Sequence, residues 1–239
     1  MPNWCWNNMN ITKGDKNKIL DQDAEVDFNL MVPMPETIRN TEASSMSEYW
    51  MYVYLSDKFT KSPDEVKKDP RSSLINNMFS DDWITETCNR AKKQFDTPEK
   101  IDEAYKQGHK YITNYELYGS PTWYEWSCKN WGTKWNSCDT SISRDEPDNL
   151  EVGFNTAWNP PYAWFDALMF EGYEFTDDWE EEGGLAGHYR VKDGEVKSDK
   201  IFSYSFENTY DDCPIIEFTP YDKDHKIRKY AEYCPLVFY

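Results

Sequence analysis

Polar and apolar residues alternate near the N-terminus, which predicts a strand over residues 3–12. The alternation places Cys5, Met9 and Ile11 on one face of that strand and Trp4 and Trp6 on the other. Residues 28–36, FNLMVPMPE, are expected to be extended, because the residue before each proline is pushed out of the helical region.

Helical spacing replaces this alternation between residues 44 and 118. One stripe at that spacing is formed by Met46, Trp50, Val53 and Tyr54. Ser62, Ser80 and Thr97 are predicted to cap further helices, and Gly119 is predicted to end the last one. This part of the chain is therefore expected to form three or four packed helices.

Two more helices are expected further along the chain. Ser120 and Pro121 are predicted to open a helix that Gly132 ends, and its tryptophans are interpreted as core residues. Asn159 is predicted to cap a second helix, NPPYAWFDALMFE, over residues 159–171.

Four strands complete the pattern, over residues 133–143, 150–158, 173–182 and 184–196, the last two joined by a hairpin at Gly183 and Gly184. The order is strand, helix, strand, strand, helix, strand and one extra C-terminal strand. This order predicts an α+β fold with a ferredoxin-like split βαβ antiparallel sheet. The predicted core covers 1–40 and 120–196, with a helical insertion at 41–119 and a C-terminal extension at 197–239 whose placement the pattern does not indicate.

The composition indicates a folded and strongly acidic chain. Hydrophobic residues make up 38%, and aromatic residues make up 17%, so large rings supply much of the buried area. The net charge of -18 disfavours ordinary nucleic-acid binding, because a phosphate backbone requires Lys and Arg. Three interpretations of the charge stay open: a plain acidic surface, attraction to a basic partner, or imitation of a polyanion.

The expected location is the cytoplasm of a bacterial host. The N-terminal residues lack the pattern of a signal peptide, and no apolar stretch reaches the roughly 20 residues that cross a membrane. None of the six cysteines forms a C-x-x-C pair, so reduced thiols are expected. A zinc site at Cys128 and Cys138 is not favoured, because neither has a close partner, and no metal or other cofactor is predicted.

Five short motifs resemble one known family: MPNWC at the start, VPMPE at 32–36, WYEWSCKNWGTKW at 123–135, FNTAWNPP at 154–161, and DWEEEGGLAGHYRVKDGEV at 178–196. Through them the chain resembles the YubB-type ferredoxin-like family, whose members are encoded on phages and plasmids. The resemblance implies the ferredoxin-like fold and an origin as a phage accessory gene. It implies no catalytic residue, because no activity is established for the family. Asn155 stands where the family pattern has an acid, and Asn159 where it has a serine, so a role of that acid would be weakened here.

Acidic residues crowd the closing hairpin and the loop at 145–151. They are predicted to form a contact surface for a basic partner, made up of Asp145, Glu146, Asp148, Glu174, Asp177, Asp178, Glu180, Glu181 and Glu182. In a strand such residues alternate between faces, so not all of them can line one site. A charged strand that discourages edge-to-edge pairing is the simpler interpretation.

Other polar residues suggest different sites. A pocket for a small ligand such as a nucleotide would be lined by Asn130, Thr133, Lys134, Asn155 and Thr156. An enzyme would use a Cys128/His188 pair, which requires the two side chains within hydrogen-bonding distance.

Aromatic residues on a ferredoxin-like sheet also suggest RNA binding, since bases can stack on them. Phe154 and Trp158 hold such positions, but no basic residue flanks them, so packing in the core is the preferred interpretation.

The favoured hypothesis is a non-enzymatic phage or mobile-element accessory protein that binds and inhibits a host protein, as an anti-defence factor. The partner would be basic or nucleic-acid-handling, with no direct contact to nucleic acid or membrane. A nucleotide-binding or sequestering protein is the alternative, and an enzyme is the least favoured.

Overall fold

The computed structural model describes residues 3–75, 82–203 and 214–217, and these form two compact units. The first unit consists of the chain up to Pro33 and from Ser127 onward, and the second is Met34–Trp126. The predicted ends of the insertion were 41 and 119, whereas the second unit extends from 34 to 126. No helix among the described residues is long and apolar enough to span a membrane.

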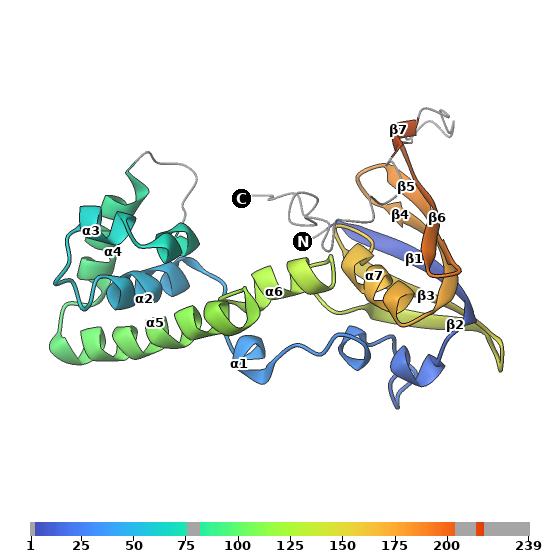
Figure 1. Ribbon diagram of the computed structural model, residues 1–239, viewed down its shortest axis with the longest axis horizontal. Helices are drawn as coiled ribbons and strands as arrows, with labels where there is room; N and C mark the ends of the chain where they lie inside the picture. Colours follow the sequence, from blue (N-terminus) through green and yellow to red (C-terminus); the bar gives the residue numbers. More distant parts are fainter. Residues whose placement is uncertain (1–2, 76–81, 204–213, 218–239) are drawn as a thin grey trace. The chain divides into compact units, whose positions relative to one another are not determined.

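An antiparallel sheet of seven strands dominates the first unit (Figure 1). In chain order the strands are β1 Trp4–Lys13, β2 Cys138–Glu146, β3 Asn149–Ala157, β4 Glu174–Glu181, β5 Leu185–Lys192, β6 Glu195–Ser203 and β7 Pro214–Glu217. The helices of the framework are α6 Trp123–Asn130, after β1 in the chain, and α7 Tyr162–Phe170, after β3. The spatial order is β2-β3-β1-β4-β5-β6-β7. The first four of these strands have the ferredoxin-like order, so the predicted fold class is confirmed.

Aromatic rings fill the space between the sheet and α7. Trp164 and Phe165 of α7 are fully buried, and the ring centroid of Trp164 lies 4.7 Å from that of Phe28 in the short 3-10 helix η2 Phe28–Leu30. The Phe165 ring stacks on Tyr189 of β5 at 5.3 Å. A second 3-10 helix, η1 Lys16–Lys18, follows β1.

Two predicted helix starts in this region are wrong. Ser120 does not cap α6, which begins at Trp123, because the carbonyl of Thr122 accepts the N–H of Trp126. Asn159 does not cap α7, because the helix begins at Tyr162 and its N-cap position is Pro161, two residues after Asn159.

Two strand predictions also need correction. Residues 133–137 do not belong to β2, because the buried Thr133 donates its hydroxyl to the carbonyl of Ala157 and holds this segment away from the ladder. The single strand predicted over 184–196 is two strands. Asp193 and Gly194, with φ of 55° and 71°, form a two-residue turn between β5 and β6.

The second unit is helical. Its elements are α1 Glu36–Arg39, α2 Ser45–Leu55, α3 Pro63–Lys67, the 3-10 helix η3 Pro70–Ile75, α4 Trp83–Gln94, α5 Pro98–Tyr118 and the start of α6. The predicted caps Ser62 and Thr97 and the terminating Gly119 are confirmed. The predicted cap Ser80 lies outside the described residues.

Close approach of α2 and α5 determines the core of this unit. Gly108 of α5 lies against the backbone of α2, and a Cβ there would be 2.0 Å from the carbonyl oxygen of Trp50. Met51, Tyr52 and Val53 of α2 are buried beside Tyr111 and Ile112 of α5. The predicted stripe on α2 is therefore only part of its buried surface, because helices pack on more than one side of α2.

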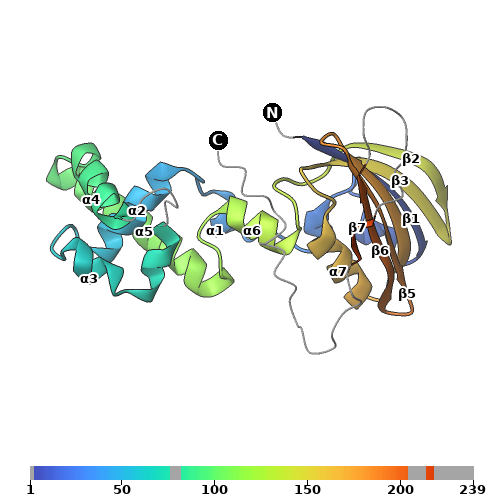
Figure 2. The same ribbon diagram turned by 90° about the horizontal axis from the view of Figure 1, so that it is seen from above.

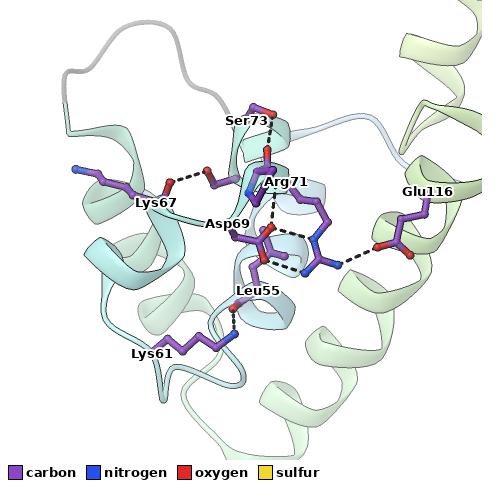
Figure 3. Close-up of polar contacts among 9 residues, drawn as sticks. Leu55, Lys61, Lys67, Asp69, Arg71, Ser73 and Glu116 are labelled. Atoms are coloured by element: carbon purple, nitrogen blue, oxygen red, sulfur yellow. Dashed lines mark hydrogen bonds and ion pairs between the residues drawn. The ribbon is translucent and has the colours of Figure 1, made fainter.

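An arginine ties η3 to α5 (Figure 3). The guanidinium of Arg71 donates to both carboxylate oxygens of Asp69, at 3.0 and 2.8 Å, and to Glu116 of α5 at 2.9 Å. These contacts hold the pKa of Asp69 below its usual value, and the hydrogen bonds from Arg71 are the largest cause.

Candidate binding surface

The two faces of the sheet have different environments. Figures 1 and 2 show α7 lying along one face. The odd-numbered residues of β1 and β4 are buried on that side, among them Cys5, Asn7, Met9, Phe175, Asp177, Trp179 and Glu181. The even-numbered residues point to the opposite side, where they are exposed or half-buried. We call this side the open face and define it by Trp6, Asn8, Asn155, Asp178, Glu180 and His188.

Trp6 lies near the centre of the open face and is 45% exposed. The strand register places Asn155 of β3 on one side of it and Glu180 of β4 on the other. Ala186 follows Glu180 in the same row, and Gly153 lies opposite Asn8. Both of these residues are small, and the indole ring of Trp6 is accessible. The alternation in the sequence predicts Trp6 opposite the buried residues of β1, as the structure confirms, but no local pattern indicates a binding role for this residue.

Hydrogen bonds organise the polar residues around Trp6. Nδ1 of His188 lies 2.7 Å from a carboxylate oxygen of Asp178. The amide of Asn155 donates to Asp139 at 3.1 Å. Glu180 makes no hydrogen bond or ion pair with any described residue. Glu180 is therefore an exposed carboxylate that pairs with no described side chain.

Cys138 is aligned with Asn155 at the edge of the open face. Its pKa is raised to about 11, mainly by partial burial and then by the charge of Asp139. Because a nucleophilic cysteine reacts as its thiolate, this environment does not activate the Cys138 thiol.

Asp177 and Glu181, predicted as contact residues, are buried, with exposures of 0% and 7%. Their inclusion in the contact surface was wrong. They share the inner face of β4 with Phe175 and Trp179, whose side chains fill the core. Glu182 is exposed just beyond β4, and its carboxylate accepts the N–H of Trp4 at 2.8 Å.

The other predicted contact residues lie away from Trp6. Glu174 pairs with Lys13 at 3.3 Å, and Asp145 pairs with Lys16. Glu146 and Asp148, at the turn between β2 and β3, line a small hollow together with these two lysines. The structure thus separates the predicted acidic surface into a part on the open face and a part at the β2–β3 turn.

The residues predicted for a ligand pocket do not converge. Thr133 and Thr156 are fully buried and hydrogen-bond to the backbone. Asn155 precedes Thr156 on β3, so its side chain points to the opposite face. Nζ of Lys134 lies 4.6 Å from the ring centre of Trp135, and Asn130 is half-buried at the end of α6.

The predicted Cys128/His188 pair is not assembled either. His188 lies on the open face. Cys128 is buried on α6, three residues before Trp131. The carbonyl of Trp131 accepts the N–H of Trp164 in α7, so Cys128 lies on the side of the sheet that α7 covers, opposite the open face. Cys128 is likewise separated from Cys138, which is aligned with Asn155 at the edge of the open face. Within the described ranges, no cluster of three or more His, Cys, Asp or Glu side chains could hold a metal ion.

The predicted packing of Phe154 is found in the structure. It is 2% exposed and packs against Phe28 and Trp164, at 6.0 and 6.3 Å. Trp158 lies beyond the end of β3, with a φ of 75°. Phe154 therefore has no free ring face for a base.

A polar cluster lies inside the unit, beneath the open face. The amide of Asn7 donates to the carbonyls of Cys5 and Phe154 and to the hydroxyl of Thr156. Asp177 is fully buried, and neither of its carboxylate oxygens has a hydrogen-bond partner. Burial raises the pKa of Asp177 well above its usual value, and the nearby charge of Asp178 adds to this.

One of the comparisons with known proteins, the match to a family model, agrees with the fold. Residues 130–219 match a family model described as the ferredoxin-like domain in Api92-like protein. The crystal structure of protein api92 from Yersinia pseudotuberculosis aligns with 86% of this chain and 99% of its own, at 11% identity and a TM-score of 0.37. The comparison with curated proteins gives no match. The strand order and the matched model together show a ferredoxin-like α+β unit, similar over residues 130–219 to the domain of Api92-like proteins.

Proposed function

We propose that the protein binds another protein through the open face and that the contacting surface of this partner is basic. The observation that carries the proposal is an exposed tryptophan between polar and acidic side chains, on the sheet face opposite α7. Large aromatic residues at the centre of an interface often contribute most of the binding energy. The net charge of -18 favours association with a positively charged surface.

The proposed biological role rests on the resemblance of the sequence motifs to one family. The resemblance to the YubB-type family supports an origin on a phage or another mobile element. We propose that the partner is a host protein in the bacterial cytoplasm, that binding inhibits it, and that the protein acts as an anti-defence factor. The sequence offers no catalytic motif that would compete with a binding role.

The test is an affinity pull-down of the tagged protein from a bacterial host lysate, at low and at high salt, with bound proteins identified by mass spectrometry. One variant carries Asp178→Lys and Glu180→Lys on the open face. The matched control carries Glu146→Lys and Asp148→Lys at the β2–β3 turn, which changes the charge by the same amount on the same sheet.

The expected result is one stoichiometric host protein that high salt releases, because salt screens contacts between exposed charges. The open-face variant should lose it and the turn variant should retain it. An empty bait at low salt, or equal retention by both variants, would contradict the proposal. Far-UV circular dichroism of each variant verifies that it is folded.

A further inference from the structure

We propose that the open face recognises an arginine side chain of the partner, with its guanidinium stacked on the ring of Trp6 and paired with the carboxylate of Glu180. This inference rests on the proposed function and specifies its central contact.

The ring of Trp6 has the properties of a cation-binding surface. It makes no ring contact or cation–π contact with a described residue, although it is 45% exposed. Tryptophan is the strongest cation–π acceptor among the side chains. The same unit contains such a contact within the chain, because Nζ of Lys134 lies 4.6 Å from the ring centre of Trp135. Trp135 thus already has a cation, whereas Trp6 is free to receive one.

Glu180 supplies the charge beside that ring. It is the cross-strand partner of Trp6, and side chains in such a position have Cβ atoms roughly 5 Å apart. Asp178, next on the same face of β4, is already paired with His188 at 2.7 Å. Asp139 is held by the amide of Asn155 on the other side of Trp6. Glu180 is therefore the carboxylate that can accept a hydrogen-bonded cation while that cation covers the indole.

The geometry favours arginine over lysine. A guanidinium is flat, stacks on aromatic rings, and presents donors in a fork that matches a carboxylate. The lysine ammonium is a strongly hydrated point charge, so it does not stack on the ring and pair with the carboxylate at the same time. A nucleobase could also stack on Trp6, but its phosphates would face Glu180 and Asp178 on a chain with a net charge of -18.

The test is isothermal titration calorimetry of the full chain with two synthetic probes, a nona-arginine and a nona-lysine peptide, at low salt. Trp6→Leu retains an apolar side chain but removes the aromatic ring. Glu180→Gln removes the accessible carboxylate. Glu146→Gln is the matched charge control, since it lies six residues along the ladder, roughly 20 Å away.

The arginine peptide should bind more tightly than the lysine peptide. Trp6→Leu and Glu180→Gln should each weaken arginine binding by about two- to fivefold, and Trp6→Phe should fall between wild type and Trp6→Leu. The Glu146→Gln variant should bind like the wild type. An unchanged affinity in Trp6→Leu, or equal losses in Glu180→Gln and Glu146→Gln, would overturn the inference, because general acidity would then explain the binding. Tighter binding of a single-stranded oligothymidine through Trp6 would also overturn it.

The two proposals fail in different ways. One outcome is a pull-down partner that depends on Asp178 and Glu180 and yet binds equally well to Trp6→Leu and to the wild type. That result supports the proposed function and refutes the arginine site. A bait without any partner refutes the proposed function, whereas the peptide titration still decides whether Trp6 and Glu180 form a guanidinium site.

Discussion

The buried carboxyl of Asp177 predicts an unusual dependence of stability on pH. Asp177 lies between its strand partners Met9 and Tyr189, is fully buried, and has no hydrogen-bond partner for either oxygen. A charged carboxylate in such a place is strongly destabilising. Its raised pKa therefore means that the folded protein retains the proton to higher pH than the unfolded chain does.

The sign of the effect follows from proton counting. The unfolded chain loses the proton near the ordinary Asp pKa of about 3.9. Between that pH and the higher pKa of the folded state, the folded protein binds one more proton than the unfolded one. The free energy of unfolding then decreases as the pH rises, by up to about 1.4 kcal/mol per pH unit from this residue alone.

The perturbation is Asp177→Asn, which has nearly the same size and cannot ionise. Urea unfolding of both proteins would be followed by tryptophan fluorescence and far-UV circular dichroism from about pH 5 to about pH 8. The stability of the variant relative to wild type should increase with pH, with a slope of up to about 1.4 kcal/mol per unit. Taking the difference removes the contribution of groups that titrate alike in both proteins. Cys5 and Tyr162 are not among these groups, because burial raises their pKa values and the charge of Asp177 raises them further.

Glu180→Gln is the matched control, because it removes an exposed carboxylate from the same strand. Relative to wild type it should produce no such slope. A difference between Asp177→Asn and wild type that does not change with pH, or that decreases with it, would refute the reasoning, since Asp177 would then be ionised in the folded protein.

Two further predictions concern the helical unit, both measured by urea unfolding. Gly108→Ala should destabilise it by about 1–3 kcal/mol despite the better helix propensity of alanine, because the new methyl group overlaps the backbone of α2. A variant as stable as the exposed-site control Lys106→Ala would contradict this. Arg71→Ala should cost about 1 kcal/mol near neutral pH, since it removes partly exposed contacts to Asp69 and Glu116. The cost should shrink as acid protonates Asp69, whose pKa is lowered in the folded state, and a cost that stays constant into acid would contradict the pairing.

Local signals in the sequence predicted most of the fold. Ser62 and Thr97 cap the starts of helices, and Gly119 ends one. Each does so through contacts with residues close to it in sequence, so a short stretch of sequence is enough to predict these helix boundaries. The alternation in β1 and β3 likewise identifies which residues share a face. The turn at Asp193 and Gly194 lies within a stretch predicted to be one strand, although Asp-Gly is a common two-residue hairpin sequence.

The candidate site was harder to predict because it depends on register between distant strands. No local pattern indicates that Glu180 lies beside Trp6, more than 170 positions earlier in the chain, or that Asn155 lies on its other side. The predicted ligand pocket does not form for a related reason. Asn155 and Thr156 are adjacent in sequence, and adjacency in a strand places side chains on opposite faces.

The acidic strand β4 shows how one run of similar residues serves two purposes. Phe175 and Trp179 are four positions apart, and burying both rings forces Asp177 between them to the inside. Asp178 and Glu180 then necessarily point outward, where their charges are hydrated and available to a partner. A charge-reversal series over the whole strand would therefore combine the loss of surface contacts with the loss of the fold. A lysine in place of Asp177 or Glu181 would unfold the sheet, and the resulting loss of binding would be mistaken for the loss of a direct contact. Only substitutions at the even-numbered positions test the binding surface, and only those at the odd-numbered positions test the buried carboxyl.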